Sequence, residues 1–130
     1  LEQASILAPD SARYHLHLGQ ARAKVRRDSL AVAAYQAARD AAPGWTQVHY
    51  ELGMLYLRGR RPRQARESFA AALELAPDHA PSHFGLSLAY IDLQRDADAV
   101  TQLQEVLRLD PDFPRAAELL QRVRTRIGRR

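Results

Sequence analysis

Apolar residues recur along the chain at the three- and four-residue spacing of a helix face, in stretches separated by short polar breaks. One such break is Gly59-Arg60-Arg61-Pro62, in the middle of the chain. The stripe before it comprises Val48, His49, Leu52, Leu55 and Tyr56, and the stripe after it comprises Ala65, Phe69, Ala72, Leu73 and Leu75. The pattern therefore predicts two amphipathic helices joined by a tight turn.

This helix pair repeats with a period of 34 residues. Ala8-Pro9-Asp10 and Ala76-Pro77-Asp78 lie 68 residues apart, with Ala42-Pro43-Gly44 midway between them and Pro111 continuing the series. The period predicts three complete units, residues 12–45, 46–79 and 80–113, with no insertion between them. Pro62 suits the first turn of a second helix, Asp28 and Asp96 are N-cap candidates, and prolines 43, 77 and 111 are expected to end the second helices.

Small residues occupy the places where two helices must approach closely, and bulky residues fill the space between them. The small positions are Gly19, Gly53 and Ser87 in the first helices and Ala31, Ala65 and Ala99 in the second. The bulky positions are Leu18, Leu52 and Leu86, then Tyr35, Phe69 and Leu103. Because neither helix can bury its apolar face alone, the sequence predicts an all-α solenoid of stacked units.

These motifs resemble the tetratricopeptide repeat family. The second unit matches the family pattern as His49-x2-Leu52-Gly53-x2-Tyr56, Ala65-x3-Phe69 and Pro77, with His in place of Trp. The third unit has Ser87 for Gly and Leu103 for Phe, and the first has Arg22 where Tyr is expected. The resemblance implies a right-handed superhelix whose first helices line a concave face that binds peptides.

Both ends of the chain depart from a complete unit. Residues 1–11 fit the tail of a preceding second helix, so we expect an upstream repeat. Residues 114–130 fit another first helix, which is either a capping helix or half of a truncated repeat. The arginines of this segment favour the cap.

The first helices of the second and third units are apolar on two faces, which predicts a strip that needs a second surface to cover it. Polar and basic side chains flank the strip. The predicted partner-binding groove comprises Leu16, Gln20, Lys24, Tyr50, Met54, Leu57, Arg58, Phe84, Leu88, Ile91, Arg115, Arg122 and Arg126. Alternatively, superhelical curvature lets neighbouring units bury the strip, and the arginines serve solubility and capping.

Catalytic and metal chemistry finds no support in the sequence. With no cysteine among 130 residues, thiolate nucleophiles and thiolate metal sites are excluded. No hydrolase, zinc-protease or phosphate-loop motif is present. His15, His49 and His83 recur at the repeat period, so they are strung along the solenoid and cannot converge on one ion; they are expected to pack between helices. We therefore expect no enzyme, cofactor or metal.

The leading hypothesis is a protein-interaction scaffold that binds a peptide or an acidic amphipathic helix in the apolar groove. The alternative is self-association through the same groove, giving a homo-oligomer. The net charge of +4 keeps a nucleic acid or an anionic lipid as a third, weaker candidate. The family's carboxylate clamp is absent, because its places hold Leu16, Gln20, Glu51, Pro81 and Gly85.

The source and compartment are constrained only weakly. The bias towards Arg and Ala is typical of a GC-rich genome and favours a bacterial protein, in the cytoplasm or the periplasm. No apolar run approaches the length of a transmembrane helix.

Overall fold

The computed structural model describes residues 10–24 and 27–129, which form helices joined by short turns. The prediction of an all-α solenoid is confirmed, and the described residues contain no strand. The helices are α2 (Asp10–Lys24), α3 (Asp28–Ala41), α4 (Thr46–Arg58), α5 (Pro62–Leu75), α6 (Ala80–Asp92), α7 (Asp96–Leu109) and α8 (Ala116–Gly128). The second helices α3, α5 and α7 begin at the same place in successive 34-residue units.

The helix ends follow the sequence signals with one difference. Pro62 occupies the first turn of α5, where its missing N–H removes no helix hydrogen bond. Asp28 and Asp96, predicted as N-caps, are instead the first helical residues after Arg27 and Arg95, and neither of those capping positions makes a side-chain cap hydrogen bond. The N-cap prediction was wrong because both carboxylates bind arginines of the following first helix.

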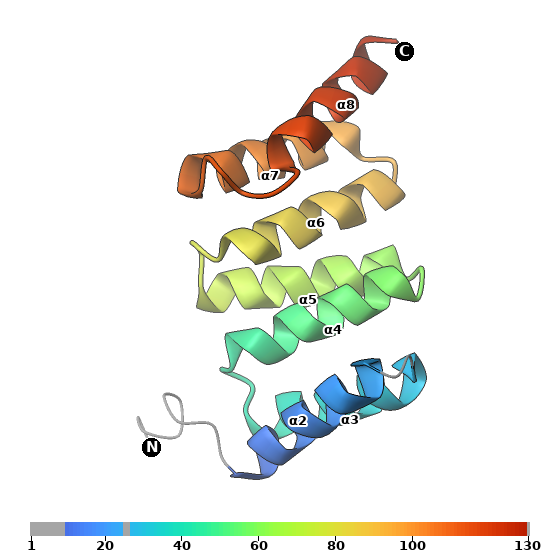
Figure 1. Ribbon diagram of the computed structural model, residues 1–130, viewed down its shortest axis with the longest axis vertical. Coiled ribbons are helices and arrows are strands. Elements are labelled where there is room, and N and C mark those ends of the chain that lie inside the picture. Colours follow the sequence, from blue (N-terminus) through green and yellow to red (C-terminus); the bar gives the residue numbers. More distant parts are fainter. Residues whose placement is uncertain (1–9, 25–26, 130) are drawn as a thin grey trace.

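The helices stack in one continuous array (Figure 1). Each first helix packs against the second helix of its own unit, as α2 does with α3, and each second helix packs against the next first helix, as α5 does with α6. The first helices α4 and α6 also touch each other. The last helix, α8, packs against α7 and closes the red end of the ribbon.

Phe69 of α5 shows why small residues recur at fixed places. Its ring is fully buried between two glycines, Gly53 of its own unit and Gly85 of the next. A Cβ atom built on Gly53 would lie 2.7 Å from the ring, and one built on Gly85 would lie 2.3 Å from it. The ring therefore fixes the spacing both within a unit and between units.

The core runs along the whole stack between first and second helices. One apolar cluster joins α2 to α6 through residues such as Tyr35, Leu52 and Phe69, and a second joins α6, α7 and α8 around Leu103 and Leu120. None of the helices among the described residues is long and apolar enough to cross a membrane.

Candidate functional site

Two adjacent hollows lie over the faces of the first helices. The first, of about 340 Å³, lies over α4 and is bordered by Met54, Leu57 and Leu88 among others. The second, of about 280 Å³, lies between α6 and α8 and is bordered by Phe84, Leu88 and Leu119, with Arg115, Glu118 and Arg122 around them. Because Leu88 borders both, the hollows form one depression running from α4 across α6 to α8, called the groove below.

The seven apolar residues of the predicted strip differ in how far they reach the surface. Met54 is exposed, with 38% of its surface accessible. Tyr50, Leu57, Leu88 and Ile91 are half-buried. Leu16 is only 4% exposed and packs in the core cluster, so its assignment to the groove surface is corrected. Neighbouring units thus cover part of the strip and leave its centre open.

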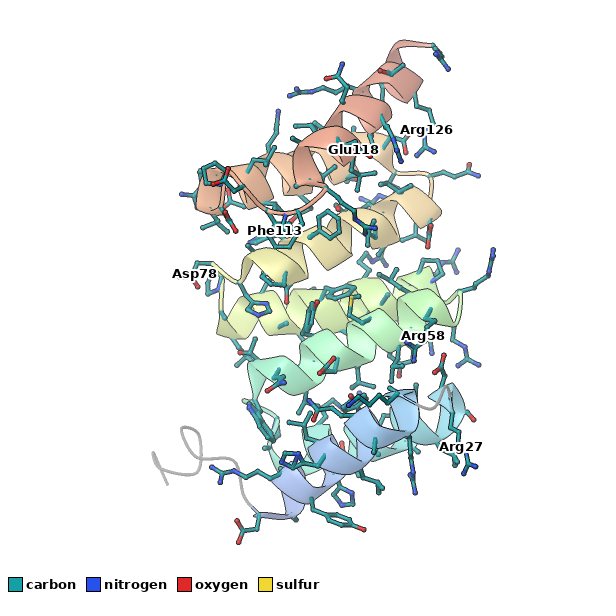
Figure 2. All side chains as sticks on the ribbon, viewed as in Figure 1. Arg27, Arg58, Asp78, Phe113, Glu118 and Arg126 are labelled. Carbon is teal, nitrogen blue, oxygen red and sulfur yellow. The ribbon has the colours of Figure 1, made fainter. Side chains whose placement is uncertain are left out.

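Aromatic side chains form the floor of the strip. Tyr50 lies edge-on to the ring of His79, with centroids 5.4 Å apart, and contacts Phe69. Phe84 is 9% exposed, because Phe113 from the turn before α8 stacks on it at 5.1 Å and the Arg115 guanidinium lies 5.9 Å from its ring (Figure 2). Phe84 therefore supports the second hollow from below rather than projecting into it.

The basic residues predicted to flank the strip have different roles. Arg58 of α4 donates to both carboxylate oxygens of Asp28, at 2.6 and 2.8 Å, and this hydrogen bonding raises the pKa of Arg58. Arg126 of α8 holds Asp96 in the same bidentate way. These two arginines link a second helix to the next first helix, so their assignment as ligands for a partner is corrected.

The remaining polar residues of the prediction lie at the two ends of the groove. Near α2, Gln20 donates a hydrogen bond of 3.3 Å to Glu51, and Lys24 is exposed. Near α8, Arg122 pairs with Glu118 at 2.8 Å on the helix surface. Arg115 is exposed and forms no ion pair within the described part of the chain. The groove thus has an acidic residue at its first hollow and a free guanidinium at its second.

Tyr35 of α3 contributes a phenol to the first hollow. The residue is 2% exposed, and burial together with the nearby Glu51 carboxylate raises its pKa well above its usual range. The hydroxyl is therefore neutral at every physiological pH. It cannot serve as a base there, and the hollow offers a hydrogen-bonding group rather than a reactive one.

The periodic histidines have a structural role that sequence reasoning identified only in part. His49 Nε2 lies 2.8 Å from the Pro43 carbonyl oxygen, and His83 Nε2 lies 2.7 Å from that of Pro77. Each ring therefore donates to the turn that precedes its helix. The signal was available as a proline six residues before each histidine. Within residues 10–24 and 27–129, no group of three His, Asp or Glu side chains is placed to hold a metal ion.

Sequence reasoning also missed the linkage between units. Asp28 pairs with Arg58 and Asp96 with Arg126, both across 30 residues, and the two pairs stand two periods apart. The equivalent places in the middle unit hold Pro62 and Asp92, so the spacing occurs in only two of the three junctions. That gap hid the pattern.

Comparisons with known proteins agree with this fold. A sequence model of the family described as tetratricopeptide repeat matches residues 50–112. No curated protein sequence matches the chain. Among solved structures, the first TPR of Spaghetti (RPAP3) bound to the HSP90 peptide SRMEEVD superposes with a TM-score of 0.89 at 19% identity, covering 91% of this chain and 94% of that one.

Two further structures extend the comparison. The Arabidopsis OM64 TPR domain has a TM-score of 0.87 at 18% identity, covering 89% of this chain and 96% of that one. YrrB, described as a TPR protein with an unusual peptide-binding site, has a TM-score of 0.82 at 22% identity, covering 92% of this chain and 62% of that one. At these identities the likeness establishes the fold.

Proposed function

Because the chain is a tetratricopeptide-repeat protein, we propose that it is a non-catalytic interaction module that binds an acidic amphipathic helix in the groove. Structures of the same fold hold peptides, as in the Spaghetti domain with its HSP90 peptide. The observation that supports the proposal here is the pair of hollows that meet at Leu88.

The apolar part of the groove suits the stripe of a helix. Met54 is accessible at its centre, and the half-buried Leu57, Leu88 and Ile91 surround it. Exposed apolar residues gathered in a depression are typical of interaction sites, and Met is enriched in interface cores. Burying such a side chain contributes about 1.5–3 kcal/mol, so three or four together support micromolar binding after the cost of association.

Charge gives the partner a composition and a direction. Arg115 at the second hollow lies over the Phe84 ring with no carboxylate of its own, so a partner's Glu or Asp can bind it. Glu51 at the first hollow disfavours an acidic group there. The acidic end of the bound helix therefore lies towards α8.

The same charges argue against a terminal carboxylate tail of the HSP90 type. Two of the family's clamp places are unsuited to an anion, because Leu16 is buried in the core and Glu51 is itself a carboxylate that accepts from Gln20. A tail that needs cations at these places would meet an apolar side chain and a like charge.

A titration with two synthetic helices tests the proposal. One has a Leu and Met stripe flanked by Glu, and its twin has Lys in place of Glu. Fluorescence anisotropy should show tighter binding of the Glu helix. Arg115→Glu should weaken that binding by about fivefold, or ~1 kcal/mol, because it removes the attraction and adds a repulsion.

Two control variants lie on α5, away from the groove. Arg63→Glu makes the same charge change at an exposed position, and Leu75→Ala truncates a side chain that is 45% exposed. Met54→Ala should weaken binding severalfold while Leu75→Ala should not. Equal binding of the two helices, or equal effects of Arg115→Glu and Arg63→Glu, would refute the proposed groove.

A further inference from the structure

One face of α2 is open where the same face of every later first helix is buried. In α2 this face is formed by Tyr14, Leu18 and Ala21, called the α2 stripe below. Tyr14 is 64% exposed, Leu18 is half-buried and Ala21 is exposed. The residues at the equivalent places, all buried, are Val48, Leu52 and Leu55 in α4, Ser82, Leu86 and Ala89 in α6, and Ala116, Leu120 and Val123 in α8.

In those three helices the face is covered by the second helix of the preceding unit. The junction of α7 and α8 shows the contacts clearly, because Leu103 and Val106 pack in one cluster with Ala116, Leu120 and Val123. Tyr35 and Ala38 of α3 do the same for α4, sharing a cluster with Val48, Leu52 and Leu55. A bulky residue and an apolar residue three places later are therefore what this face receives.

The chain contains the same set of residues at its N-terminus. Three periods before Leu103, Val106, Ala116, Leu120 and Val123 stand Leu1, Ala4, Tyr14, Leu18 and Ala21, with Pro9 at the place of Pro111. Residues 1–9 lie outside the part of the chain that the structure describes. We propose that residues 1–9 dock on the α2 stripe as the end of a second helix, with Leu1 and Ala4 against Tyr14, Leu18 and Ala21.

The stripe supplies the stability that so short a segment lacks. An isolated helix shorter than about 12 residues is marginal in water. Docking removes the apolar surface of Tyr14 from water and places Ala4 where Ala38, Ala72 and Val106 are fully buried. Because the segment is joined to α2 directly, its docking is intramolecular and needs no second molecule.

The other end of the array is built differently, which makes the α2 stripe specific. A following second helix needs a small residue at the place of Gly19, Gly53 and Ser87, because a Cβ on Gly19 would lie 2.8 Å from the Tyr35 ring. The residue of α8 at that place is Gln121, and Arg124 stands three residues later; both are exposed. In this proposal α8 caps the array, and only its α2 end accepts a further helix.

Hydrogen–deuterium exchange of the α2 amides tests the docking with a pair of adjacent substitutions. Ala4→Asp places a carboxylate at a position whose equivalents are fully buried. Gln3→Asp adds the same charge at a position whose equivalents, Ala37, Ala71 and Glu105, are half-buried. Ala4→Asp should speed exchange in α2 by about tenfold, whereas Gln3→Asp should leave it near that of the parent chain. Unchanged exchange in α4–α8 would show that the rest of the fold is intact.

A reciprocal variant and a mass measurement distinguish the other occupants. On a Tyr14→Asp background, Ala4→Asp should add no further effect, because the face is already lost. Equal α2 exchange in the parent chain and in both single variants would overturn the proposal. A concentration-dependent dimer that Tyr14→Asp abolishes and Ala4→Asp preserves would also overturn it, since the face would then be covered by a second copy. These results concern the α2 end and leave the groove proposal unaffected.

Discussion

The substitution Gly85→Ala tests how tightly the units are stacked. The added Cβ would lie 2.3, 2.4 and 2.8 Å from three atoms of the Phe69 ring, well inside the range of real contacts. The ring has nowhere to move, because it is fully buried and its other side faces Gly53, where a Cβ would lie 2.7 Å away. A single methyl group at this junction must therefore displace α6 from α5.

The magnitude follows from two opposing contributions. Replacing Gly by Ala inside a helix stabilises it by about 1 kcal/mol through backbone entropy. Overpacking a well-filled core typically costs about 1–3 kcal/mol, and contacts this short place the cost at or above the upper end. The net expectation is a loss of about 1–2 kcal/mol in the free energy of unfolding.

Urea unfolding followed by circular dichroism measures this loss. Gly44→Ala is the control, because Gly44 is exposed in a turn and a Cβ there meets nothing within 4 Å. Its effect should stay within about 0.5 kcal/mol. Combining Gly85→Ala with Phe69→Leu should cost less than the sum of the two single changes, since the smaller side chain makes room. A Gly85→Ala chain as stable as the parent would refute the reasoning.

The other predictions concern ion pairs and pH. Arg126→Gln should destabilise the chain by about 1 kcal/mol or more in urea unfolding, because its partner Asp96 is 3% exposed. Arg58→Gln should cost less, since Asp28 is half-exposed; equal losses would contradict this ranking. Burial lowers the pKa of His79 below its usual value of about 6.5, so neutral His79 contributes stability above that pH and the contribution is lost on acidification through the lowered pKa. His79→Gln should remove this part of the pH dependence of the urea midpoint, and an unaltered profile would show that His79 is not its source.

The repeat made the fold predictable from sequence. The 34-residue period, the small residues at 19, 53 and 87, and the prolines after each second helix specify where helices start, end and touch. The Asp28 and Asp96 caps were mispredicted because an N-terminal Asp suits either a cap or an ion pair. Only the position of α4 beside Asp28 and of α8 beside Asp96 decides between them.

The groove was predictable only in outline. Apolar spacing identified the strip from Tyr50 to Ile91, but spacing cannot show how far the next unit covers each residue. Leu16 and Phe84 are buried because of tertiary neighbours, the α2–α4 core for one and Phe113 with Arg115 for the other. Likewise, Arg58 and Arg115 look alike in sequence, and only the nearby carboxylate of Asp28 separates a structural arginine from an unpaired one.

Mapping a bound helix by NMR tests the central claim most directly. Titration of the labelled chain with the Glu-flanked helix should shift resonances of Met54, Leu88 and Arg115, which lie on α4, α6 and the turn before α8. The exposed residues of α5 and α7 should remain unshifted. A footprint confined to those second helices, or one centred on the α2 stripe, would contradict binding in the groove.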